Sequence, residues 1–247
     1  MNPTVAEYAL SRLTALGIDR VFGVPGDYAF SIDDAVENVP ELQWVGCANE
    51  LNAAYAADGY ARIRGAAILT TTYGVGELSA INGVMGSKAH RLPVFHLVGM
   101  PSERIQRLAL VTHHNLGDTV YDRFQPISAA ACCVSAVLTP DNCIDELERV
   151  IREALRQSMP AYVVISEVNG LMPVIGTPVP GHATEPVEAA AKRPEGTRGC
   201  HRSRPGEAGG GHQPGRPRDD VGGTLRPATA GRGLGGEGQS SGGRDPR

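Results

Sequence analysis

The chain is poor in features that mark several common protein classes. It has a single tryptophan, no apolar run near the ~20 residues that a membrane span requires, and no basic N-terminal segment followed by an apolar one. We therefore expect no membrane partner and no signal peptide. It has five cysteines, an odd number, and their spacing is not that of metal ligands (Cys47, Cys132, Cys133, Cys143 and Cys200). This pattern favours reduced thiols in a cytoplasmic protein.

The C-terminal part of the chain lacks the residues that build a core. Residues 192–247 hold 16 of the 31 glycines and six prolines, but no aromatic residue and only three large apolar side chains. Such a composition buries too little surface to offset its ordering entropy, so we predict a disordered tail over 195–247. The tail is basic, yet without aromatic residues we expect no nucleic-acid partner.

The remaining sequence alternates between short apolar runs and helical patterns. We expect helices from the N-cap Asn2 and Pro3 to Gly17, and over about 31–38, 50–63, 77–87 and 141–158. Strands are expected at 20–24, 43–47, 66–72, 93–98, 129–138 and 161–166, with a polar loop at 100–120. This alternation predicts an α/β fold, a doubly wound and mostly parallel sheet with helices on both faces.

Polar candidates follow the predicted strands. In a parallel α/β sheet ligands bind at the carboxyl ends of the strands, so residues that follow different strands meet at one edge. The candidates are Asp27 after the first strand, Glu50 after the second, Thr71 and Thr72 at the end of the third, and His113 and His114 after the fourth. Their common placement predicts a functional site.

Each candidate also has a simpler interpretation. Asp27 can be a turn residue, Glu50 can cap its helix, the paired histidines can be solvated, and the threonines can be ordinary strand residues. The segment 74–76 (GVG) lacks the third glycine of a dinucleotide fingerprint and a P-loop lysine, so it is a weak phosphate-binding signal. The coincidence of the candidates at one sheet edge favours a site over these separate explanations.

Four segments, in this order, resemble the thiamine-diphosphate-dependent 2-oxo acid decarboxylases. They are 20–30 (RVFGVPGDYAF), 48–62 (ANELNAAYAADGYAR), 70–79 (TTTYGVGELS) and 113–118 (HHNLGD). The likeness covers about residues 3–180 and implies that residues 1–180 form the family's N-terminal pyrimidine-binding domain. The paired histidines resemble this decarboxylase branch more than the carboligating synthases of the same superfamily.

The resemblance implies how the cofactor would be held. Glu50 is expected to hydrogen-bond the pyrimidine ring nitrogen of thiamine diphosphate and to favour the imino form of that ring, which activates the cofactor. Thr72 and the neighbouring backbone of Gly74 and Val75 are expected to form the wall beneath the pyrimidine.

The resemblance also implies the substrate side of the site and a partner. Asp27, His113 and His114 are expected to orient a 2-oxo acid and to exchange protons with it, since an adjacent acid and imidazole pair can couple their titrations near neutral pH. The family's site lies between two chains of a homodimer or tetramer. The alanine face of the helix at 50–63 is expected to let the second subunit pack closely.

The other half of the family's site is missing from this sequence. Family members are more than twice as long, and a further domain carries a Gly-Asp-Gly…Asn motif that holds Mg²⁺ and the diphosphate. No Gly-Asp-Gly occurs here, and residues 192–247 contain no asparagine. No metal ligand is therefore assigned, and the chain alone is expected to bind the cofactor weakly and to be inactive.

The sequence changes character near residue 194. Residues 181–194 resemble a linker and the start of a truncated middle domain, after which the apolar periodicity does not return. A frameshift near codon 194 would explain the Gly/Arg/Pro-rich tail, and a genuine disordered tail is the alternative. A decarboxylase half-site is the preferred function; a non-catalytic fragment or pseudogene product that only pairs with related domains is the alternative.

Overall fold

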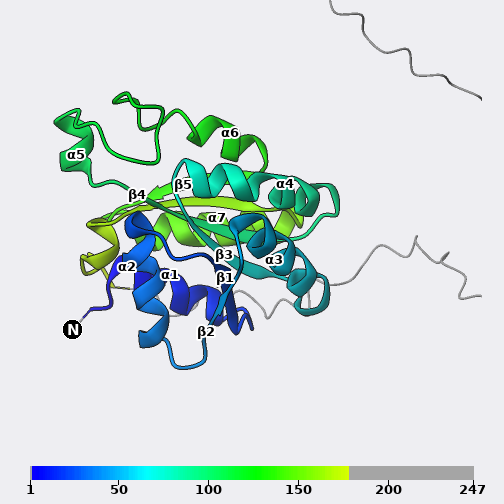
Figure 1. Cartoon of the computed structure of the whole chain (residues 1–247). Coiled ribbons are helices and arrows are strands. Elements are labelled where there is room, and N and C mark those ends of the chain that lie inside the picture. The colour runs from blue at the N-terminus through cyan, green and yellow to red at the C-terminus, as the bar shows by residue number, and fades with distance from the viewer. Residues whose placement is uncertain (1, 178–247) are drawn as a thin grey trace, which may run out of the picture. The chain divides into compact units, whose positions relative to one another are not determined.

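The computed structural model describes residues 2–177, which contain a six-stranded sheet (Figure 1). Every neighbouring pair of strands is parallel, in the order β2-β1-β3-β4-β6-β5. The strands are β1 (Arg20–Gly23), β2 (Gln43–Gly46), β3 (Ala67–Thr72), β4 (Val94–Met100), β5 (Val134–Leu138) and β6 (Ala161–Ser166). The predicted α/β fold is confirmed, and the sheet is entirely parallel.

Helices cover both faces of this sheet (Figure 1). The helices are α1 (Val5–Thr14), α2 (Phe30–Asp33), α3 (Glu50–Arg64), α4 (Val75–Ala89), α5 (Glu103–Arg107), α6 (Gln125–Ala130) and α7 (Cys143–Gln157), with 3₁₀ turns η1 (Asp27–Ala29), η2 (Asp34–Asn38) and η3 (Asn169–Leu171). Apolar side chains of α1, α2 and α7 form the core on one face, and those of α3 and α4 form the core on the other. The central strands β3, β4 and β6 are buried along their whole length.

The first helix starts later than its sequence suggested. Thr4 is the N-cap, and it forms a reciprocal capping box with Glu7. Asn2 does not cap the helix, because its amide instead donates to the carbonyl of Val174 at 3.2 Å. Thr4 also forms an isolated antiparallel bridge with Pro173, so the two ends of the described segment are joined.

Three other expected elements differ from the structure. The helix at 31–38 divides into α2 and the 3₁₀ turn η2. The loop at 100–120 contains the short helix α5. The strand expected at 129–138 begins only at Val134, because residues 125–130 form α6. That helix has Pro126 in its first turn but no side-chain cap and only six residues, so it left a weak sequence signal.

The alanine face of α3 packs inside its own chain, which contradicts the expectation that a second subunit lies on it. Ala53, Ala54, Ala57 and Ala61 are at most 1% exposed and face α4 and the sheet. A Cβ on Gly83 of α4 would lie 2.6 Å from the Cβ of Ala54. The small residues therefore bring two helices of one chain together and leave no room for another chain there.

The order of the strands creates a crevice where ligands commonly bind. The chain runs from β1 outward to β2 and then returns to the other side of β1 to form β3. Such a reversal leaves an opening at the carboxyl ends of the two strands. Asp27 follows β1 and Thr72 ends β3, so both lie at this opening.

Two predicted segments lie outside the described residues. These are the linker at 181–194 and the disordered tail at 195–247. Within residues 2–177, no helix combines the length and the apolar character needed to cross a membrane.

Candidate active site

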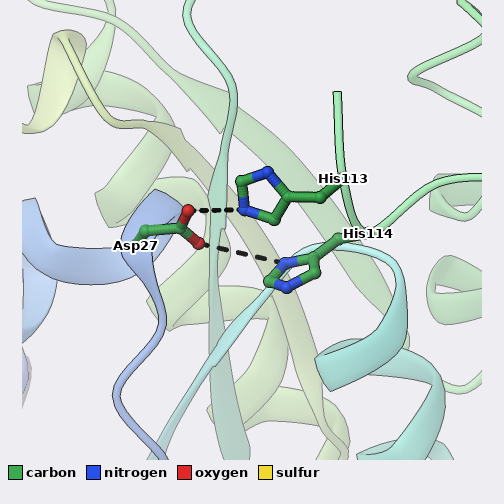
Figure 2. Close-up of side chains that lie close together, drawn as sticks. All are labelled: Asp27, His113 and His114. Carbon is green, nitrogen blue, oxygen red and sulfur yellow. Dashed lines mark hydrogen bonds and ion pairs between the residues drawn. The ribbon is translucent and has the colours of Figure 1, made fainter. Parts of the chain in front are cut away.

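Asp27 holds two histidines that come from a distant part of the chain (Figure 2). The Nε2 atom of His113 lies 2.5 Å from Oδ2 of Asp27, and Nδ1 of His114 lies 4.0 Å from Oδ1. Each imidazole thus faces a different oxygen of one carboxylate (Figure 2). The two histidines are therefore not merely solvated loop residues, and Asp27 does more than form a turn.

Two tyrosines fix the orientation of His113. The hydroxyl of Tyr28 lies 3.2 Å from His113 Nδ1, and the two rings stack with centroids 4.8 Å apart. Tyr73 donates its hydroxyl hydrogen to the backbone carbonyl of His113 at 2.9 Å. Our sequence reasoning missed both tyrosines as supporting residues. Tyr28 lies in the turn η1 that follows β1, and Tyr73 comes directly after β3. This position inside two of the quoted motifs was the signal that could have found them.

His114 is held in an environment that keeps its imidazole neutral. Its Nδ1 lies 3.3 Å from Oγ1 of Thr72, and its side chain is 28% exposed, against 54% for His113. Burial, and then the neighbouring His113, lower the pKa of His114. The carboxylates of Asp27 and Glu50 oppose this shift, so Glu50 also lies close enough to act on this imidazole.

Glu50 stands at the start of α3 without capping it. The cap is Asn49, whose side chain accepts a hydrogen bond from the backbone nitrogen of Asn52 at 2.9 Å. Glu50 is half-buried, and no other described residue hydrogen-bonds its carboxylate. A half-buried carboxylate with no hydrogen-bond donor among the described residues can accept a hydrogen bond from a ligand.

A tight turn after β3 brings the strand end against the histidine loop. Gly74 has φ +65°, and a Cβ at this position would overlap the backbone carbonyl oxygen of His114. The buried carboxylate of Glu77 fixes this turn, because it accepts hydrogen bonds from Gly74 N at 2.9 Å and from the hydroxyls of Ser128 and Tyr162. Burial raises the pKa of Glu77 in spite of these three donors. Sequence reasoning also missed Glu77.

The other predicted residues of this region divide into two groups. Thr72 is buried and contacts His114, whereas Val75 is 53% exposed at the start of α4. Thr71 does not reach the histidine pair, because its hydroxyl lies 2.9 Å from Nε2 of the buried His96. Burial lowers the pKa of His96 to about 3, so the imidazole of this third histidine is neutral and has a structural role.

The residues present fit a flat, nitrogen-containing ring. Gly76 carries no side chain at the place where a Cβ would approach Thr72 Cγ2 to 3.0 Å and Glu50 Oε1 to 3.4 Å. The Glu50 carboxylate therefore stands beside bare backbone, with an acceptor free for a ring N–H or amino group.

Comparison with known proteins gives this geometry a family. Residues 3–125 match the family described as "Thiamine pyrophosphate enzyme, N-terminal TPP binding domain". The chain belongs to this family. Thiamine pyrophosphate is another name for thiamine diphosphate, so the resemblance inferred from the four motifs is confirmed.

Several curated relatives carry the same name. The chain is 46% identical over 190 residues to the alpha-keto-acid decarboxylase of Mycobacterium avium, which covers 77% of this chain and 32% of that protein. It is 44% identical over 181 residues to the protein of the same name from Mycobacterium leprae, covering 72% and 32%. The chain thus spans about a third of the length of the curated relatives that it matches.

Proposed function

We propose that this chain supplies the pyrimidine-binding half of a thiamine-diphosphate-dependent decarboxylase that converts a 2-oxo acid into an aldehyde and carbon dioxide. The family match and the names of the relatives support the reaction class. The observation that carries the proposal is the half-buried Glu50 carboxylate, which no other described residue hydrogen-bonds and which lies near the Asp27, His113 and His114 cluster.

Glu50 would hold the cofactor by its aminopyrimidine ring. Thiamine diphosphate, when bound, supplies the electron sink that makes loss of carbon dioxide possible. Glu50 would share a proton with the ring nitrogen, while Thr72, Gly74 and Val75 would form the wall beside the ring. Glu77 would keep the turn that contains Gly74 in place through its bond to the Gly74 nitrogen.

Asp27, His113 and His114 would handle protons on the substrate side. His114 has a lowered pKa and is therefore a proton acceptor near neutral pH, while Asp27 holds His113 through Nε2. The Tyr28 hydroxyl at Nδ1 allows His113 to change its protonation with both ring nitrogens still engaged. One carboxylate between two imidazoles can take up one proton and release another during a single turnover.

The diphosphate and Mg²⁺ would be bound by residues outside the described domain. The sequence of 247 residues contains no Gly-Asp-Gly, so we assign no metal ligand for Mg²⁺ in it. We propose residues 1–180 as the pyrimidine-binding domain of an oligomeric, cytoplasmic enzyme, and expect that this chain alone does not turn over a 2-oxo acid.

A hybrid enzyme tests the function. Residues 3–180 would replace the matching segment of the Mycobacterium avium relative, and carbon dioxide release would be measured with pyruvate, phenylpyruvate, indolepyruvate and branched-chain 2-oxo acids. We expect release by the hybrid with at least one of these substrates and none by the present chain alone, whose thiamine diphosphate binding would be weak by calorimetry. A folded, cofactor-binding hybrid that releases no carbon dioxide would favour the alternative, a non-catalytic fragment that pairs with related domains. Turnover by the present chain alone would refute its predicted inactivity.

A further inference from the structure

The cluster of Asp27, His113 and His114 has a second chemical property, which does not depend on thiamine diphosphate. Each residue offers one ligand atom, and the three atoms all lie within 4.8 Å of one another. The cluster is open on one side, since Asp27 and His113 are exposed and His114 is half-buried. Figure 2 shows the carboxylate of Asp27 facing both imidazoles, which come from two consecutive residues of a distant segment.

We propose that Asp27, His113 and His114 form a binding site for one divalent transition-metal ion of the Zn²⁺ type. Two imidazoles and one carboxylate are ligands that Zn²⁺ accepts, and three protein ligands leave a fourth position for water. Mg²⁺ and Ca²⁺ prefer sites built from oxygen atoms, so neither is expected here.

The spacing of the ligand atoms suits a small ion. Ligand atoms bound tetrahedrally to zinc at about 2.0–2.1 Å stand roughly 3.3–3.4 Å from one another. The two nearest approaches to Asp27 involve different oxygens: His113 Nε2 lies 2.5 Å from Oδ2, and His114 Nδ1 lies 4.0 Å from Oδ1. Binding of an ion would therefore require side-chain rotations that give up the 2.5 Å His113 bond and the 3.3 Å contact between His114 and Thr72.

The surroundings of the histidines also favour a metal. Metal-bound histidines usually have their second ring nitrogen oriented by a hydrogen-bonding group. Tyr28 does this for His113, because its hydroxyl meets Nδ1 and leaves Nε2 directed at Asp27.

Titration of the full chain with ZnCl₂ by calorimetry tests this site. We expect one equivalent to bind, with affinity reduced at least about tenfold in each of D27N, H113Q and H114Q, and unchanged in the control H90Q. His90 is an exposed histidine whose ring nitrogen Nδ1 lies 2.9 Å from the carbonyl oxygen of Gly86. Y28F should also weaken binding, by roughly 10- to 100-fold, as loss of an orienting partner does. Circular dichroism of each variant separates loss of the site from loss of the fold.

Cobalt distinguishes this site from the chain's cysteines. Co²⁺ in the proposed site should show visible absorption without the intense near-ultraviolet band of thiolate ligation, and D27N should abolish it. A thiolate band would overturn the proposal, since it would assign the ion to cysteines. Zinc affinity that is equal in the parent, D27N, H113Q and H114Q would overturn it as well.

Discussion

At the scale of single residues, the site places the carboxylates of Asp27 and Glu50 near an imidazole whose neutral form is favoured. His114 is the clearest case, because burial and His113 lower its pKa while Asp27 and Glu50 raise it. The helix cap at Asn49 is equally important, since it leaves Glu50 free for another partner. The sequence indicated Asp27 and Glu50 as candidate site residues. Only the side-chain geometry shows that Glu50 does not cap its helix.

The balance at His114 can be tested by titration. We expect the imidazole of His114, followed by NMR in the full chain, to titrate below the ordinary pKa of about 6.5 for histidine. D27N and E50Q should each lower this pKa further, since each removes a carboxylate that favours the charged imidazole. A rise in either variant would contradict the arrangement described for the site.

A buried acid beside the Asp27 turn gives a second prediction. Asp33 accepts a hydrogen bond from Thr70, but its Oδ2 atom and the hydroxyl of Ser31 have no partner among the described residues. Burial raises the pKa of Asp33 to about 7. In the unfolded chain an aspartate titrates near 3.9, so between these values the folded state binds the extra proton and stability falls as pH rises.

Replacing Asp33 by asparagine removes that pH dependence. The stability associated with protonated Asp33 is complete below about pH 4 and is lost as the pH rises to about 7. The free energy of unfolding of D33N relative to the parent, from urea denaturation, should therefore improve by roughly 2 kcal/mol between pH 5 and pH 7. A difference that stays constant with pH would show that Asp33 is ionised in the folded protein throughout this range.

At the scale of elements, periodicity predicted the strands and long helices, while local contacts decided their ends. The buried strand β6 matches its expected range, 161–166. The start of α1 was missed because Asn2 and Thr4 are both good caps, and the capping box between Thr4 and Glu7 shows which one is used. The partner of the alanine face could not be predicted, since small residues allow close packing by any neighbour.

The contact between α3 and α4 makes a prediction about glycine. G83A places a methyl group 2.6 Å from the Cβ of Ala54 and 3.1 Å from its backbone carbon, so we expect a loss of about 1–3 kcal/mol in unfolding free energy. The matched control is G86A in the same helix, where a Cβ meets only the ring of Tyr55 at 4.0 Å. This control should be neutral or stabilising by up to about 1 kcal/mol. Equal effects of the two substitutions on urea denaturation would refute the close packing.

At the scale of the whole molecule, the described domain presents exposed apolar side chains on α3 and α4. Leu51 and Tyr55 of α3 and Leu78 and Met85 of α4 are between 37% and 51% exposed. The hydroxyl of Tyr55 in α3 donates a hydrogen bond to Oδ1 of Asn82 in α4 at 2.6 Å. The exposed faces of the two helices are therefore joined in one surface. We propose that a second subunit packs on this surface.

The proposed subunit contact can be tested in the hybrid enzyme. M85E should weaken self-association in sedimentation velocity, because it places a charge in an apolar contact. L171E is the control, since Leu171 is also exposed but lies in η3. Equal sedimentation of the parent and both variants over a concentration series would contradict the assignment of this surface.

We propose that Glu50 binds the pyrimidine ring of thiamine diphosphate and shares a proton with it. The most direct measurement is carbon dioxide release by the hybrid enzyme with E50Q, at saturating thiamine diphosphate and Mg²⁺. Glutamine keeps the shape of the side chain but cannot share a proton as a carboxylate does, so we expect the turnover rate to fall by at least about 100-fold while the fold is retained. A hybrid that carries E50Q and keeps the turnover rate of its parent would contradict the account.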